Sequence, residues 1–127
     1  MNSYLLAAGI LAFIVGLVHS ILGEVLIFRR LRSHGIIPTQ GGELLKERHV
    51  RILWASWHIL TVLGWCAAAI LWCLAQNFPG SPSHHFVARA IAVAMFVSAA
   101  MVFVSTKAKH PGWVGLLGVA ILVFAGE

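Results

Sequence analysis

The stretch YLLAAGILAFIVGLVHSILGEVLIF, Tyr4–Phe28, is apolar over 25 residues and is clearly interrupted only by His19, Ser20 and Glu24. An α-helix rises about 1.5 Å per residue, so about 20 residues cross the roughly 30 Å hydrocarbon core of a bilayer. This stretch therefore predicts a membrane-spanning helix. The residues before it carry no charged side chain and the apolar run is too long for a signal peptide, so we expect the segment to be retained.

The composition of the whole chain is that of a membrane protein. Of its 127 residues, 60% are hydrophobic and 10% are charged, whereas about a quarter of the residues of a soluble domain are charged. Three further apolar stretches follow the first. Together the four predict spans over about 4–28, 52–74, 86–104 and 113–125. The expected fold is all-α, a single domain over residues 1–127 that forms an antiparallel four-helix bundle in the membrane.

The basic residues predict the orientation of this bundle. Eight of the nine Lys and Arg residues flank the first and third connections between the predicted spans, and only Arg89 lies toward the opposite side of the membrane. The eight are Arg29, Arg30, Arg32, Lys46, Arg48, Arg51, Lys107 and Lys109. Because the Lys and Arg bias sets membrane orientation, we expect both basic loops in the cytoplasm and both termini outside, in a bacterial inner (plasma) membrane. Such cations suit anionic lipid head groups, at about 1 kcal/mol each, so the expected partner is the bilayer and not nucleic acid.

The connections contain helix-breaking residues. In the first, Pro38 and the pair Gly41-Gly42 interrupt the chain, and the segment GELLKERH (42–49) is expected to resume a helix that leads into the second span. The segment QNFPGSPSHH (76–85) predicts a turn, with solvated or interfacial histidines at 84 and 85. Pro111 is expected in the first turn of the last helix.

Small residues line one face of the first span. Gly9, Gly16 and Gly23 recur every seven residues, and His19 and Ser20 share their stripe. Small residues allow close helix approach in lipid, so this stripe is the expected packing face, with His19 inside the bundle and Glu24 at the edge. The second span has a corresponding stripe of polar and aromatic residues: Trp54, Trp57, His58, Thr61 and Trp65.

Two histidines are expected at similar depth. His19 precedes Arg29 by ten residues and His58 follows Arg48 by ten, which places each up to about 15 Å inside the cytoplasmic boundary. Ionisable residues within spans are costly and often mark pathways or ligand sites. The sequence therefore predicts an inward-facing polar site made of His19, Glu24, His58, Thr61 and His110.

Three functions are compatible with this site. The first is the binding or transport of protons or of a transition-metal ion, with His19, His58, Glu24 and His110 as metal ligands, because imidazole suits Zn, Cu, Fe and Ni. The second is a b-type haem protein in which His19 and His58 are the axial ligands. The candidate cofactors are thus a transition-metal ion or haem b.

The third function is that of a structural or assembly subunit without chemistry of its own. In that case Gly9, Gly16, Gly23 and Thr61 serve packing, within the chain or against a second copy or a larger membrane complex. Polar contacts, such as His19 with His58 or Thr61, and Glu24 with a cation, then hold the helices together, at about 0.6–2 kcal/mol each. An enzyme is the least supported class, because the chain lacks G-x-S-x-G, H-E-x-x-H and phosphate-loop motifs. Our working hypothesis is the first function.

Overall fold

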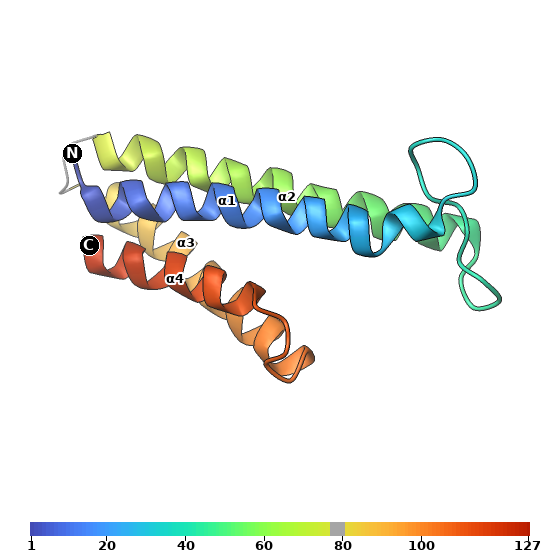
Figure 1. Ribbon diagram of the computed structural model, residues 1–127. Coiled ribbons are helices and arrows are strands. Elements are labelled where there is room, and N and C mark those ends of the chain that lie inside the picture. The colour runs from blue at the N-terminus through green and yellow to red at the C-terminus, as the bar shows by residue number, and fades with distance from the viewer. Residues whose placement is uncertain (77–80) are drawn as a thin grey trace. The chain divides into compact units, whose positions relative to one another are not determined.

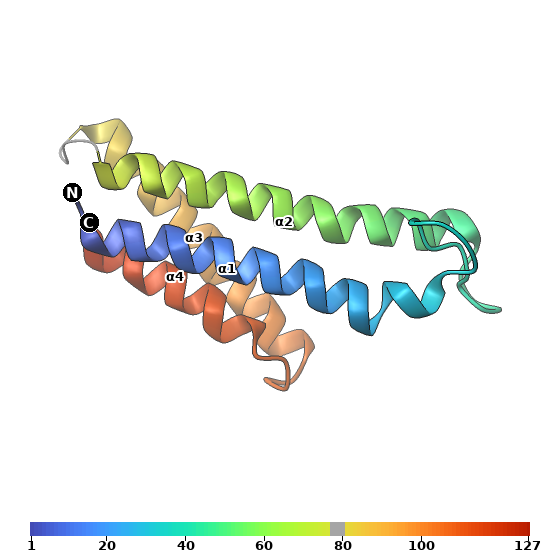
Figure 2. The same ribbon diagram turned by 45° about the horizontal axis from the view of Figure 1, so that its top comes forward.

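The computed structural model describes residues 1–76 and 81–127. These residues form four α-helices and one short 3-10 helix, shown in Figures 1 and 2: α1 (Ser3–Leu26), η1 (Phe28–Leu31), α2 (Glu47–Gln76), α3 (Pro82–Ser105) and α4 (Gly112–Gly126). The described part of the chain has no β-strand, and its only β-pairing is an isolated bridge between Gly41 and Leu45. The prediction of an all-α fold with four helices is confirmed.

Three of the four helices are long and apolar enough to cross a membrane. They lie within Ser3–Leu31, Glu47–Gln76 and Pro82–Ser105, with 29, 30 and 24 residues. The fourth helix has 15 residues, fewer than the roughly 20 that a perpendicular crossing requires. α2 and α3 extend several residues beyond the predicted spans, because their polar first turns continue the helical hydrogen bonding without contributing to the apolar signal.

The prediction that residues 42–49 resume a helix is wrong in its first half. Gly42 has φ +65, which is not helical, and Leu45 N donates to Gly41 O at 3.3 Å to close a turn. The helix therefore begins only at Glu47. There Arg51 Nε donates to Glu47 Oε1 at 2.8 Å, and an acidic residue in the first turn also suits the positive end of the helix dipole.

The starts of the other helices have local causes. Asn2 Oδ1 accepts hydrogen bonds from the backbone N–H groups of Tyr4 and Leu5, both at 3.1 Å, and so caps α1. At α3, Ser81 Oγ accepts from His84 N at 3.1 Å and proline follows it at the first helical position. Pro111 is the N-cap residue that directly precedes α4, one position before the first turn in which it was predicted. The turn predicted over 76–85 lies partly in residues 77–80, outside the described residues.

The chain divides into two compact units. The first, here called the four-helix unit, comprises Met1–Val15 and Gly64–Glu127 and contains parts of all four helices. Its apolar core is rich in alanine and consists of Leu5, Ala8, Ala12, Ala68, Leu71, Ala75, Ala88, Ala92, Val119 and Val123. A Cβ atom on Gly9 would lie 3.0 Å from Ala68 O. Small residues therefore bring the backbones of α1 and α2 close together in this unit.

The two histidines at the start of α3 differ in exposure. His84 is 7% exposed, so it is buried, and the expectation of a solvated or interfacial side chain is wrong for it. His85 Nδ1 lies 2.8 Å from Glu127 Oε2, and Arg89 Nε lies 3.6 Å from the same oxygen. The prediction failed because the turn before α3 looks polar in sequence, whereas the helix starts at Pro82 and includes both histidines in its first turn.

The second unit comprises Gly16–Leu63 and is here called the two-helix unit. It contains the second half of α1, the first half of α2 and the connection between them. Only a few of its large apolar side chains are buried, among them Phe28 and Val50. The candidate functional residues lie in this unit.

Candidate functional site

A close aromatic contact holds α1 against α2 in the two-helix unit. Trp57 Nε1 donates a hydrogen bond to the carbonyl oxygen of His19 at 3.0 Å. The Trp57 and His19 rings stack, with centroids 4.3 Å apart and an interplanar angle of 7°. A Cβ atom on Gly23 would overlap the Trp57 indole. The absence of a side chain at Gly23 is therefore what allows Trp57 to lie here.

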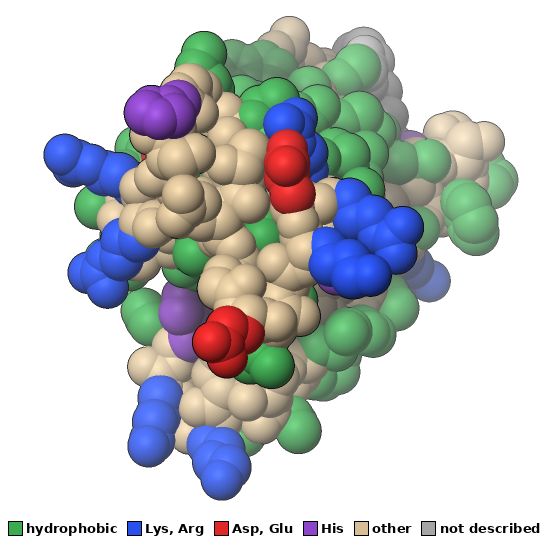
Figure 3. All heavy atoms as spheres, turned by 90° about the vertical axis from the view of Figure 1, so that its right-hand side faces the viewer, with side chains coloured by type: hydrophobic (Ala, Val, Ile, Leu, Met, Phe, Trp, Pro, Cys, Tyr) green, Lys and Arg blue, Asp and Glu red, His purple; other side chains and the backbone are tan. Residues whose placement is uncertain are grey.

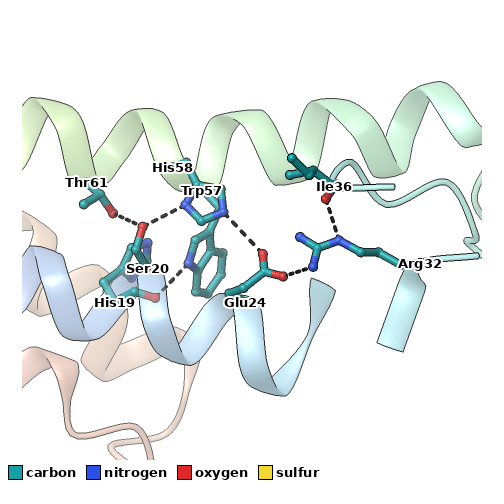
Figure 4. A network of polar contacts seen from close by, with 8 residues as sticks. All are labelled: His19, Ser20, Glu24, Arg32, Ile36, Trp57, His58 and Thr61. Atoms are coloured by element: carbon teal, nitrogen blue, oxygen red, sulfur yellow. Dashed lines mark hydrogen bonds and ion pairs between the residues drawn. The ribbon is translucent and has the colours of Figure 1, made fainter. Parts of the chain in front are cut away.

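Beside this contact, polar side chains from both helices form a continuous line, shown in Figure 4. Ser20 Oγ lies 3.0 Å from Thr61 Oγ1 and 2.7 Å from His58 Nδ1. On the opposite edge of the imidazole ring, His58 Nε2 lies 3.8 Å from Glu24 Oε2. The other carboxylate oxygen of Glu24 forms an ion pair with Arg32. We call the residues Thr61, Ser20, His58, Glu24 and Arg32 the polar line.

Helical spacing explains why these residues meet. Ser20 and Glu24 are four residues apart in α1, and His58 and Thr61 are three apart in α2, so each pair shares one face of its helix. The two segments run in opposite directions. Ser20, the earlier residue in α1, contacts Thr61, the later residue in α2, whereas Glu24 lies beside His58. The faces then interleave so that Ser20 lies between Thr61 and His58.

Arg32 enters the line through the fold of the first connection. It follows η1, and its Nε donates to the carbonyl oxygen of Ile36. The backbone N–H groups of Thr39 and Gln40 both donate to Leu31 O, at 3.1 and 2.9 Å. The chain thus turns back on itself beside Arg32, and this turn holds the guanidinium on Glu24.

The line is closed at one end and open at the other. Thr61 is 3% exposed, whereas the side chains of His58 and Glu24 are 28% and 30% exposed. The hydroxyl end is thus buried between the helices, and the carboxylate end faces the first connection.

The hydrogen-bonding capacity of these groups gives the line two states. A hydroxyl has one donor and two acceptor positions, and a neutral imidazole donates from one nitrogen and accepts at the other. With the proton on Nε2, which faces Glu24, His58 Nδ1 accepts from Ser20, and Ser20 accepts from Thr61. With a proton on Nδ1, His58 donates to Ser20, and Ser20 donates to Thr61. When the proton moves from one ring nitrogen of His58 to the other, the direction of both hydroxyl hydrogen bonds is therefore reversed.

Aromatic side chains surround the imidazole of His58. The Trp54 ring meets it edge-on at a centroid distance of 5.0 Å, and the Phe28 ring lies at 6.0 Å. Trp54 Nε1 is buried and makes no hydrogen bond to any described residue. Between these rings, the two nitrogens of the imidazole face Ser20 and Glu24.

Several predicted site residues come together in the polar line and others do not. Glu24, His58 and Thr61 belong to it, whereas the His19 ring stacks on Trp57 beside it. Gly16 and Gly23 are buried in α1 of the same unit. His110 belongs to the four-helix unit, where its Nδ1 accepts a hydrogen bond from Gly112 N at 3.0 Å. Within residues 1–76 and 81–127, no group of three or more His, Cys, Asp or Glu side chains is arranged to hold a metal ion.

Sequence reasoning missed three of the residues that matter most. Ser20 was assigned to the packing stripe, although its position one turn before Glu24 was a sign that it shares the polar face. Trp57 was expected near His58 without a specific partner. Arg32 lies beyond the end of α1, and only the folded connection brings it to Glu24.

Comparisons with protein-family models, with curated proteins and with solved structures find no match to this chain.

Proposed function

We propose that this chain is an integral membrane protein of a bacterial inner membrane that takes up and transfers protons through the polar line. The four helices form an antiparallel bundle with the basic connections in the cytoplasm and both termini outside. The observation that carries the proposal is the position of Ser20 Oγ, which is shared between His58 Nδ1 and Thr61 Oγ1 while Glu24 faces the other ring nitrogen.

Exposed aliphatic side chains support the membrane location. In α2 alone, Ile59, Leu60, Val62 and Leu63 are each at least 54% exposed. A contiguous apolar surface of this kind is unfavourable in water and suits the hydrocarbon core of a bilayer. The 15 residues of α4 extend about 22 Å, and local thinning of the bilayer accommodates a short helix at modest cost.

Proton transfer along the line needs only small movements. A proton arriving from the cytoplasm binds the Glu24 carboxylate and moves to His58 Nε2. The imidazole then releases its Nδ1 proton to Ser20 Oγ, and the original Ser20 proton moves to Thr61 Oγ1. Thr61 in turn gives its own hydroxyl proton to a water molecule on its far side, so that each group of the line keeps its number of protons. The gap of 3.8 Å between Nε2 and Oε2 closes to hydrogen-bond distance, about 2.8 Å, by side-chain rotation or is bridged by one water.

The same contacts favour protons over a metal ion or haem. His58 Nδ1 is hydrogen-bonded to Ser20 at 2.7 Å and Nε2 faces the Glu24 carboxylate. A metal or haem iron would take one of these nitrogens and would break the line at that point. The His19 ring is held flat against Trp57, so it too would have to leave its packing position to become an axial ligand.

A structural role is the second candidate, and the ion pair between Glu24 and Arg32 favours it. This pair gives the glutamate a cationic partner, as expected for a purely structural contact, and polar contacts between helices in lipid contribute about 0.6–2 kcal/mol. The two functions predict different results, because a structural contact affects stability without affecting proton movement.

The deciding experiment measures proton entry into liposomes that contain the purified protein and a pH-sensitive dye. A potassium diffusion potential drives the protons inward. We expect flux above that of empty liposomes and a loss of about tenfold or more in Ser20→Ala, since general acid–base groups contribute about 10²-fold or more. The control is Ser98→Ala, which removes a hydroxyl from α3. Absence of flux in the parent protein, or equal flux in Ser20→Ala, would contradict the proposal.

A further inference from the structure

The connection between η1 and α2 contains two projecting turns, visible in Figure 1. Gly35 and Gly42 occupy them, with φ +76 and +65, a left-handed conformation that glycine adopts without cost. Nothing lies within 4 Å of the position that a Cβ atom would take on either glycine. Both turns therefore extend away from the rest of the two-helix unit.

Each turn carries a large aliphatic side chain near its tip. Ile36 follows Gly35 and is 76% exposed, and Leu44 lies two residues after Gly42 and is 93% exposed. Exposed apolar side chains are common singly, and here each of the two projecting turns carries one. We call Ile36 and Leu44 the apolar tips.

The turns that carry the apolar tips are held in place. Arg32 Nε donates to the carbonyl oxygen of Ile36, and Ser33 Oγ lies 3.0 Å from Thr39 Oγ1. Gly41 and Leu45 pair at the base of the second turn, where a Cβ atom on Gly41 would lie 2.8 Å from Val50 Cγ2. Because the turns are ordered before any partner binds, binding costs little conformational entropy.

Basic side chains are frequent in the connection that carries the apolar tips. Residues 29–51 contain six Lys or Arg and two Glu, and Figure 3, which views the molecule from the side of this connection, shows Lys and Arg side chains on that face. Two of the cations form ion pairs with carboxylates, Arg32 with Glu24 and Arg51 with Glu47. The others form no ion pair with a described residue: Arg29, Arg30, Lys46 and Arg48.

We propose that the two turns dock on anionic phospholipid head groups of the leaflet from which α1 and α2 emerge, with Ile36 and Leu44 inserted at the boundary with the acyl chains. Each cation near an anionic membrane surface contributes about 1 kcal/mol, and apolar side chains at the interface add to this. This inference rests on the membrane location in the proposed function and is independent of proton transfer.

Two features favour lipid over a soluble acidic protein as the partner. The turns begin where α1 ends and finish where α2 starts, so the bilayer surface is the nearest partner when these helices are inserted. Apolar tips beside unpaired cations also match the order of phosphate and acyl layers in a leaflet.

The test places a fluorescent probe on each tip in nanodiscs. Ile36→Cys or Leu44→Cys is labelled with an environment-sensitive dye in a Cys66→Ala, Cys73→Ala background. The discs contain spin-labelled quencher lipid in phosphatidylcholine alone or mixed with an equal part of phosphatidylglycerol. We expect quenching at both tips in the anionic discs and at most half as much in phosphatidylcholine. The control is Gln40→Cys, an exposed polar position in the same connection, where the dye stays unquenched.

The charge variant Arg29→Gln/Arg30→Gln/Lys46→Gln is expected to halve the quenching in anionic discs, because three unpaired cations are lost. Dyes that remain water-exposed in the anionic discs, or quenching that is equal in the two lipids, would overturn the docking. The proton-flux assay on the same proteins separates this outcome from the proposed function. Tips that are quenched in a protein without flux would leave docking standing and remove proton transfer.

Discussion

Each unit of this chain holds one glutamate between a histidine and an arginine. In the four-helix unit, Glu127 lies 2.8 Å from His85 and 3.6 Å from Arg89. In the two-helix unit, Glu24 contacts Arg32 and lies 3.8 Å from His58. The difference lies on the other side of the imidazole ring. His58 continues through Ser20 to Thr61, whereas His85 has no hydroxyl partner among the described residues.

This comparison distinguishes a cluster that only compensates charge, around Glu127, from a cluster that can also pass protons on, around Glu24. A glutamate beside a histidine and an arginine compensates charge in either unit, and such a contact needs no further partner. A relay needs groups that both donate and accept protons, and only His58 is followed by two hydroxyl groups. The hydroxyl groups of Ser20 and Thr61, more than the charged residues, therefore indicate function in the two-helix unit.

The largest expected effect is the loss of proton flux after removal of His58, compared with removal of His85. His58→Ala is expected to reduce flux into liposomes by about tenfold or more, because the imidazole is the centre of the line. His85→Ala should leave the flux unchanged. Equal losses in the two variants would show that the units do not differ in the way proposed.

The second effect is coupling between the imidazole and the hydroxyl. Ser20→Ala and His58→Ala, alone and combined, are expected to be non-additive by about 0.5–3 kcal/mol in the free energy of unfolding, because either change removes the hydrogen bond that the two part-buried side chains share. Unfolding is measured in detergent by chemical denaturation. For the matched pair Ser20→Ala and His85→Ala, the changes in the free energy of unfolding should add. Coupling of similar size in both pairs would contradict the hydrogen bond between Ser20 and His58.

The third effect concerns the packing that holds the line together. Gly23→Ala places a methyl group on the Trp57 indole and is expected to destabilise the protein by about 1–3 kcal/mol, the usual cost of overpacking. Gly64→Ala is the matched control on α2, since nothing lies within 4 Å of that position. It should be neutral or stabilising by about 0.5–1 kcal/mol. Thermal unfolding compares the two, and equal stability of both variants would show that Trp57 does not occupy this position.

The smallest effect is expected at the exposed pair of Glu47 and Arg51, which are four residues apart in α2. Their side chains are 57% and 50% exposed, and such helix pairs contribute about 0.3–0.5 kcal/mol. Glu47→Gln should reduce stability by that amount at low salt and by less at high salt. A loss greater than that of Gly23→Ala would mean that the start of α2 contributes more to the two-helix unit than its contacts indicate.

Much of the fold follows from local sequence. Long apolar runs predicted four helices close to their observed positions, because helix formation depends on the composition and hydrogen bonding of neighbouring residues. Pro111 predicted the start of α4 for the same reason. Residues 42–49 misled the prediction, because local helical spacing gave no sign of the bridge between Gly41 and Leu45.

The candidate site was predictable only in its residue types. His58, Glu24 and Thr61 stood out in sequence because polar side chains are rare in apolar helices. The sequence by itself thus determined an all-helical chain with three helices suited to a membrane, an excess of basic residues in two connections, and polar residues in apolar helices.

Tertiary structure alone decided which polar groups meet. Ser20 reaches His58 and Thr61 across 38 and 41 positions of the chain, and Arg32 reaches Glu24 only after the connection turns back. Helical periodicity indicates which side chains share one face of a helix, but not the register in which two faces meet. That register depends on contacts between distant residues, here the placement of Trp57 against Gly23 and the fold of the first connection.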